Sequence, residues 1–385
     1  MRIGLLSKQS SYGGGSGQYS AAIATALVRR GHKIDLFTLG TSPEEPSTHQ
    51  NVNVITVAKP RPYLVTFETL YYSLLTRRVL DPSKYDVIHG TLMPASPIAL
   101  PIGSIETPVI VTSHGTSLGE VRSHKLEVPT DYLKKLFFHP MNVGMDTVTA
   151  PRADRVIAIS SDAQSELVSR YPVSEAAVRL IHHGVDAEEF TPEEPTHDAV
   201  SDEKTTFLHV GRLVSRKHVD LAIEAVADAD NSDLELIIAG DGRHKDRLQK
   251  RTRELGLNGQ VDFPGYVPQD ELPSLYASAE GFLFLSRYEG FGLTFLEAMA
   301  AGTPVIGTEV GGFPDIATHE VDSLFVERDP SEVSQAINRI ARDAELKDSL
   351  AESARQTAEE YTWDRTANQT EQLYRDLVRS PSGYN

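Results

Sequence analysis

The chain contains no cysteine, which excludes a disulfide framework and cysteine-ligated zinc sites. No stretch reaches about 18 consecutive apolar residues, so we expect no membrane-spanning helix. Met1 is followed directly by Arg2 and a strand-like run, Ile3–Leu6, without the apolar core of a signal peptide, and we expect a cytoplasmic protein. Basic residues are few: 37 Lys and Arg against 54 Asp and Glu give a net charge of −17. This balance argues against nucleic acid as the main partner but allows a small anion in one basic pocket.

The arrangement of apolar segments predicts the fold class. The 385 residues fit two domains, and short apolar runs alternate with amphipathic segments, which predicts an α/β fold with doubly wound parallel sheets. Residues 187–204 are rich in proline and acidic residues and read as a linker between domains at 1–186 and 205–362. Helices are expected at 330–360 and 363–378. Two such domains place a ligand between them, outside the carboxyl ends of the strands.

A glycine-rich loop, SSYGGGSGQYS (10–20), lies between the first predicted strand and a helix expected at 19–29. Gly14, Gly15 and Ser16 would let the backbone approach a phosphate at the helix N-terminus. Gln18 stands where a dinucleotide site needs its third glycine, and no acidic residue ends the second strand, which weakens a NAD enzyme as an interpretation. A tight turn that only allows helix–sheet packing is the structural alternative.

The segment VGRLVSRK (210–217) places basic residues at the end of a predicted strand. If the loop curls, the planar fork of Arg212 and the point charge of Lys217 can converge on neighbouring phosphates. A solvated loop, with Lys217 capping the next helix, is the alternative.

The segment SRYEGFGLTFLEAMAAGTPV (286–305) carries two carboxylates, Glu289 and Glu297, separated by seven residues. A helix that begins near Gly292 would offer backbone N–H groups to an anion, while the carboxylates accept hydroxyl hydrogens. The combination suits a phosphorylated polyol. A lone helix-surface glutamate would not explain the double glycine.

These segments, together with HHGVDAEEF (182–190) and AGDG (239–242), resemble the retaining nucleotide-sugar glycosyltransferases of family 4. The resemblance implies the GT-B fold, in which two Rossmann-like domains face a central cleft and a C-terminal helix, here 363–385, joins the first domain. It also implies transfer of a sugar from a UDP- or GDP-sugar to a glycan, lipid-linked or small-molecule acceptor, with retention, no obligatory metal and no further cofactor.

The resemblance also implies roles for individual residues. Arg212 and Lys217 would hold the diphosphate, Glu297 the ribose, and Glu289 and His114 the transferred sugar. Backbone groups would complete the donor site; they belong to Gly14, Gly15, Ser16, Gly240, Asp241, Gly242, Tyr266, Val267, Gly290, Phe291, Gly292 and Leu293.

Three points stay open. A sugar-nucleotide epimerase and a non-catalytic nucleotide-sugar binding protein are rival functions. The segments 61–79 and 131–145 combine basic and aromatic residues, so they either pack on the first domain or make peripheral contact with the inner membrane face. His182 and His183 stand where the family usually has Pro-Asn, and adjacent residues on a strand point to opposite sides, which argues against a paired metal site.

Overall fold

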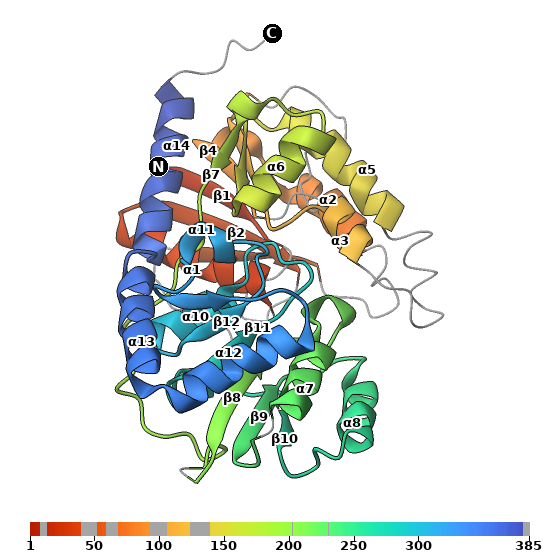
Figure 1. The fold of residues 1–385 in the computed structure, drawn as a ribbon. Coiled ribbons are helices and arrows are strands. Elements are labelled where there is room, and N and C mark those ends of the chain that lie inside the picture. Colours follow the sequence, from red (N-terminus) through yellow and green to blue (C-terminus); the bar gives the residue numbers. More distant parts are fainter. Residues whose placement is uncertain are drawn as a thin grey trace. The chain divides into compact units, whose positions relative to one another are not determined.

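A computed structural model of the chain describes residues 1–7, 14–39, 52–58, 68–91, 106–123, 139–201, 203–229 and 231–379. The chain divides into two α/β units, which are coloured along the sequence in Figure 1. Unit 1 contains Met1–Arg122, Leu126–His183 and Trp363–Asn385, and unit 2 contains Ser123–Lys125 and Gly184–Thr362. Each unit is described by itself.

Unit 1 is built on a sheet of seven strands in the order β3-β2-β1-β4-β5-β6-β7, and every neighbouring pair is parallel. The central strands 87–90 and 109–113 are buried along their whole length and begin with apolar residues, as expected when helices cover both faces. The strands are β1 Arg2–Leu6, β2 Lys33–Leu39, β3 Val52–Ala58, β4 Val87–Gly90, β5 Val109–Ser113, β6 Arg155–Ala158 and β7 Val178–Leu180.

The helices of unit 1 come from both ends of the chain. Helix α14, drawn in blue in Figure 1, contacts α1, and Leu373, Tyr374 and Leu377 on α14 share a core with β1 and β2. Helix α1 begins at Gly15 rather than near Tyr19, because the helical turn already closes between Gln18 N–H and the Gly14 carbonyl. The helices are α1 Gly15–Arg29, α2 Glu68–Val79, α3 Ser117–Ser123, α5 His139–Thr149, α6 Ser161–Arg170 and α14 Trp363–Arg379.

Unit 2 has a parallel sheet of six strands in the order β10-β9-β8-β11-β12-β13. The strands are β8 Thr205–Val210, β9 Leu234–Ala239, β10 Val261–Gly265, β11 Gly281–Phe284, β12 Val305–Gly307 and β13 Ser323–Phe325. The helices are α7 Val219–Asp228, α8 Lys245–Glu254, α9 Leu272–Ala277, α10 Leu293–Ala300, α11 Phe313–Ile316, α12 Pro330–Arg342 and α13 Ala344–Glu359.

The single helix expected at 330–360 is wrong, because α12 and α13 are separate helices. Asp343 has an extended backbone, and its carboxylate accepts the Leu346 N–H and caps α13. Two short strands, β7 and β13, were not expected either. Each has three residues, which is too short for a clear alternation of apolar and polar positions.

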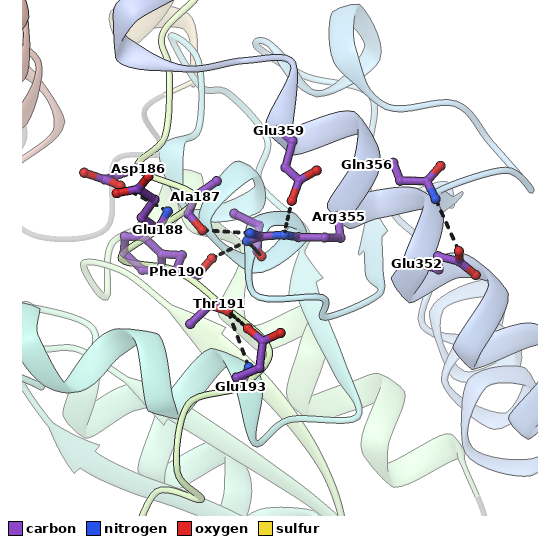
Figure 2. A network of polar contacts seen from close by, with 11 residues as sticks. Asp186, Ala187, Glu188, Phe190, Thr191, Glu193, Glu352, Arg355, Gln356 and Glu359 are labelled. Carbon is purple, nitrogen blue, oxygen red and sulfur yellow. Dashed lines mark hydrogen bonds and ion pairs between the residues drawn. The ribbon is translucent and has the colours of Figure 1, made fainter.

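Residues 187–204, which the sequence analysis interprets as a linker, fall within unit 2, and their first part is anchored there (Figure 2). Arg355 on α13 donates to the carbonyls of Ala187 at 2.8 Å, Phe190 at 2.6 Å and Ala300, and its Nε donates to Glu359 at 2.8 Å. The Phe190 ring is buried and lies 5.9 Å from the Tyr276 ring. An acidic, proline-rich composition therefore does not prevent this segment from packing.

No described helix is both long and apolar enough to cross a bilayer. Of the two segments considered for membrane contact, residues 61–67 and 131–138 lie outside the described residues, and the remainder belongs mainly to α2 and α5.

Candidate active site

The candidate residues of unit 2 follow the carboxyl ends of four strands. Arg212 and Lys217 follow β8, Gly240–Gly242 follow β9, Tyr266 and Val267 follow β10, and residues 289–293 follow β11. In this parallel sheet the four ends share one edge. The chain builds β9 and β10 on one side of β8 and returns to form β11 on the other side, so β8 and β11 flank the switch point where α/β sheets bind ligands.

Glu289 is the centre of a buried ion cluster at this edge. Its Oε1 lies 2.6 Å from Lys217 Nζ and accepts a hydrogen bond from Ser286 Oγ at 2.7 Å, while Arg216 donates to Oε2 at 2.8 Å. Burial by itself raises the pKa of the Glu289 carboxyl, but Arg216 and Lys217 overcome this effect and hold the pKa at about 2. The carboxylate is therefore ionised and both of its oxygens are engaged.

The basic residues near Glu289 differ in burial. Lys217 is 8% exposed, and burial lowers the pKa of its ammonium, against the attraction of Glu289 and with added repulsion from Arg216 and Arg212. Arg212 itself is exposed on the loop after β8. An anion approaching this edge from solvent could therefore reach the Arg212 guanidinium.

Arg216 is the residue that the sequence analysis missed. The arginine that pairs with Glu289 directly precedes Lys217, and its Nη1 also donates to the Tyr288 carbonyl at 3.2 Å. The basic excess of VGRLVSRK was visible in the sequence. Only the 3-10 turn Ser215–Lys217 decides which of its arginines faces β11.

Glu297 lies in the second turn of α10 and is 3% exposed. The Tyr276 hydroxyl on α9 donates to its Oε2 at 3.0 Å. Burial and the Glu297 charge together raise the pKa of Tyr276, so the phenol remains a hydrogen-bond donor. The Tyr276 hydroxyl thus helps to hold the Glu297 carboxylate in place on the helix.

The loop between β9 and α8 contacts the loop after β8 closely. A Cβ at Gly240, where φ is +141°, would lie 2.0 Å from the Gly211 carbonyl oxygen, and one at Gly242 would lie 2.5 Å from that of Leu213. Any side chain would force the loops apart. The glycines are therefore required for packing, whatever ligand lies above them. Asp241 and Tyr266 are exposed, Tyr266 to 74%, and Val267 is half-buried.

The loop between β11 and α10 turns sharply before the helix. Gly292, with φ +100°, caps α10 at Leu293, and Phe291 is buried. The Phe291 carbonyl accepts the Gly312 N–H at 2.9 Å, which ties the loop after β11 to the loop after β12. The N-terminus of α10 is therefore fixed at the same edge as Glu289.

The remaining candidates lie in unit 1, where Gly14 caps α1 with φ +147°, Gly15 is exposed and Ser16 is half-buried. His114 directly follows β5. Burial lowers the pKa of His114 to about 4, so the ring is neutral near neutral pH. Its ring lies edge-on to the Tyr19 ring, with centroids 4.8 Å apart. The His183 ring stacks on Tyr19 at 4.9 Å and lies 5.2 Å from the His114 ring, so the three rings are mutual neighbours.

Among the described residues no group of three or more His, Asp or Glu side chains is placed to hold a metal ion. His182 is partly exposed whereas His183 is 2% exposed.

Comparison with known families covers most of the chain. Residues 13–189 match the family "Glycosyltransferase Family 4", and residues 191–357 match "Glycosyl transferases group 1". An uncharacterized glycosyltransferase of Methanocaldococcus jannaschii is 29% identical over 380 residues, which is 94% of each chain. A D-inositol 3-phosphate glycosyltransferase of Corynebacterium jeikeium is 27% identical over 421 aligned positions, covering 100% of this chain and 98% of the relative.

Solved structures share the fold. Sucrose-phosphate synthase from Thermosynechococcus elongatus superposes with a TM-score of 0.82 at 24% identity, over 98% of this chain and 99% of that one. Anabaena HepE in complex with UDP-glucose superposes with a TM-score of 0.77 at 19% identity, over 98% and 100%. The fold class expected from the sequence is confirmed, and the protein belongs to the family 4 glycosyltransferases with the GT-B fold.

Proposed function

We propose that the protein transfers a sugar, with retention at the anomeric carbon, from a nucleotide diphosphate sugar to a glycan, lipid-linked or small-molecule acceptor. The observation that carries the proposal is the cluster of Lys217, Arg216 and Glu289 at the switch point of unit 2. Together with the nearby exposed Arg212, it concentrates positive charge at one edge of a chain whose net charge is −17.

The donor nucleotide is the ligand that this edge fits. Arg212 and Lys217 would bind the diphosphate, and Glu297, fixed by Tyr276, would accept hydrogen bonds from the ribose hydroxyls. The base would lie over the backbone of residues 240–242 and 266–267. In unit 1 the loop of Gly14, Gly15 and Ser16 would approach the phosphates.

The transferred sugar would contact Glu289 and the backbone of residues 290–293, and His114 of unit 1. Neutral His114 suits contact with a sugar hydroxyl, because its ring nitrogens can donate or accept without adding charge. Glu289 Oε1 has two partners and Oε2 has one, so Oε2 has a lone pair left that could accept a hydrogen bond from a sugar hydroxyl.

The reaction follows from the charges. As the bond between C1 and the phosphate oxygen breaks, negative charge grows on the departing diphosphate, and Arg212 and Lys217 stabilise it in a low-dielectric site. The acceptor oxygen forms its bond to C1 on the same face, and the departing phosphate oxygen takes the acceptor proton. No enzyme carboxylate is needed as a nucleophile, in contrast to retaining glycosidases.

The relatives support the donor class. Anabaena HepE was solved with UDP-glucose, and the relative from Corynebacterium jeikeium is a D-inositol 3-phosphate glycosyltransferase. We extend the donor class to this chain, with UDP or GDP as the nucleotide, and propose catalysis without a metal ion.

Donor turnover in EDTA tests the proposal. Arg212→Ala and Lys217→Ala should each lower turnover on the order of a hundredfold, comparable to the loss of one oxyanion-stabilising donor. Lys250→Ala on α8 is the control, because the Lys250 side chain is 72% exposed and its Nζ lies 3.7 Å from Glu254 Oε1. Activity that disappears in EDTA and returns with a divalent ion would refute the metal-independent part, and unchanged activity in both site variants would refute the assignment of the site.

A further inference from the structure

His209 is a buried polar residue for which neither the fold nor the proposed donor contacts account. It occupies the penultimate position of β8 and is 3% exposed. Its Nδ1 lies 3.1 Å from the carbonyl oxygen of Leu283 on the neighbouring strand β11. A carbonyl oxygen only accepts hydrogen bonds, so Nδ1 must carry the proton.

The other ring nitrogen is therefore an acceptor. Burial, with the nearby charge of Lys217, lowers the pKa of His209 to about 4, and the ring is neutral near neutral pH. With the proton on Nδ1, Nε2 carries a lone pair. Nε2 is buried and has no hydrogen-bond partner within the described part of the chain.

The space in front of Nε2 is shared with Lys217. A Cβ at Gly211 would lie 3.8 Å from His209 Nε2 and 3.5 Å from Lys217 Nζ, so both atoms border the gap that the missing side chain leaves. Gly211 also has φ +152°, which disfavours any other residue. An unpartnered acceptor and a buried ammonium thus border the same small gap.

Lys217 has more donors than its present contacts use. An ammonium carries three N–H groups, and Glu289 Oε1 accepts one at 2.6 Å. If the diphosphate takes a second N–H, one of the three N–H groups of this buried ammonium still needs an acceptor. A buried N–H left without an acceptor is costly, so a neighbouring acceptor has a function.

We propose that His209 is a positioning residue, whose Nε2 accepts a hydrogen bond from Lys217 in the donor-bound state and aims the ammonium at the diphosphate. The inference rests on the proposed function, because it assigns Lys217 to the diphosphate. The alternative is a core histidine that only joins β8 to β11 through Nδ1.

Three substitutions separate the two ring nitrogens. His209→Asn keeps a donor near Nδ1, His209→Gln keeps a polar group near Nε2, and His209→Phe keeps only the ring. If His209 acts through Lys217, kcat should fall about tenfold or more in the Phe and Asn variants with little change in donor KM, and Gln should restore part of it. In a Lys217→Ala background the Phe substitution should have no further effect on kcat.

A spectroscopic readout is independent of turnover. The Nε2 resonance of His209, assigned from its absence in the Asn variant, should shift in the direction of an accepted hydrogen bond when UDP-glucose is added. The inference is overturned if the Nε2 resonance does not shift when a donor binds. It is also overturned if kcat is no higher in His209→Gln than in His209→Phe, or if His209→Phe still lowers kcat in the Lys217→Ala background. A wild-type protein that neither binds nor uses any nucleotide sugar refutes the proposed function, and the inference with it.

Discussion

Glu289 and Glu297 lie eight positions apart in the chain but have different surroundings. Glu289 neutralises two cations, whereas Glu297 accepts a hydrogen bond from the phenol of Tyr276. Glu289→Gln should therefore mainly lower kcat, because it disturbs the sugar contact and the cations together. Glu297→Gln should mainly raise the Kd for the nucleotide, on the order of tenfold, since only the ribose contact changes and Tyr276 can still donate. Calorimetry with UDP or GDP, beside steady-state kinetics, measures both. Equal effects on nucleotide affinity would contradict this division.

The Glu289 carboxylate also makes unit 2 sensitive to acid. The pKa of Glu289 is about 2 in the folded chain and near 4.5 when unfolded, so its contribution to stability is complete above about pH 4.5 and is lost as the pH falls toward 2. The shift corresponds to about 3 kcal/mol. The protection of peptides from β11 and α10 against hydrogen exchange, measured relative to the intrinsic exchange rate at each pH, should therefore decrease between about pH 4.5 and pH 2 in the wild type.

Two glutamine substitutions test this pH effect: Glu289→Gln removes the buried charge, and Glu352→Gln is the control. Glu289→Gln should exchange faster already at pH 7 and depend less on pH, whereas Glu352→Gln, at an exposed position of α13, should match the wild type. An identical pH profile in wild type and Glu289→Gln would show that the ion cluster does not stabilise this edge.

The sequence predicted these residues better than their partners. The sequence placed Lys217 and Glu289 in loops that follow strands and Glu297 in the second turn of a helix, where the structure has them. Pairing with Arg216 depends on the direction in which a short turn points its side chains. The roles of Ser286, Tyr276 and His209 depend on contacts between strands and helices far apart in sequence. No local pattern encodes such contacts.

At the scale of elements, the Arg355 contacts join three parts of unit 2 that are distant in sequence. The guanidinium holds the carbonyls of residues 187 and 190 and the end of α10, the helix that carries Glu297 (Figure 2). Arg355→Lys keeps the charge but loses the planar fork. We expect it to lower the free energy of unfolding by about 2 kcal/mol, because three partly buried carbonyls lose a charged donor.

Arg339→Ala is the matched control, because its bidentate pair with Glu320 is nearly half exposed on both sides and should contribute less than about 1 kcal/mol. Urea unfolding, monitored by hydrogen exchange at residues 186–190 and 293–300, gives the loss in free energy of unfolding for each variant. Comparable losses in the two variants would show that the Arg355 contacts add nothing beyond a surface ion pair.

Elements were predictable where the apolar run was long. The strands of both sheet centres follow from continuous apolar runs, whereas β7 and β13 were too short to recognise. The break between α12 and α13 had a readable signal in Asp343, a helix-capping residue followed by Leu346. The anchoring of residues 187–190 had no readable signal in the sequence, because it depends on Arg355, which is 165 residues away from Phe190.

At the scale of the whole molecule, the candidate residues are divided between the units. His114 lies in unit 1, and the ion cluster lies in unit 2. His114→Ala should therefore leave the affinity for UDP or GDP within about twofold of the wild type while lowering kcat, because the nucleotide contacts are proposed for unit 2. Nucleotide titration and turnover of the same preparation measure both. A large loss of nucleotide affinity would place His114 in a different role.

The central claim is sugar transfer with retention from a nucleotide diphosphate sugar. Its most direct test is proton NMR of UDP-glucose and GDP-mannose, each incubated with the protein, EDTA and candidate acceptors including inositol phosphate. We predict that the α-linked donor is consumed, that the nucleoside diphosphate is released, and that an α-linked product appears. A β-linked product would contradict retention, an isomerised donor would indicate an epimerase, and bound but unchanged donors with every acceptor would contradict the claim of transfer.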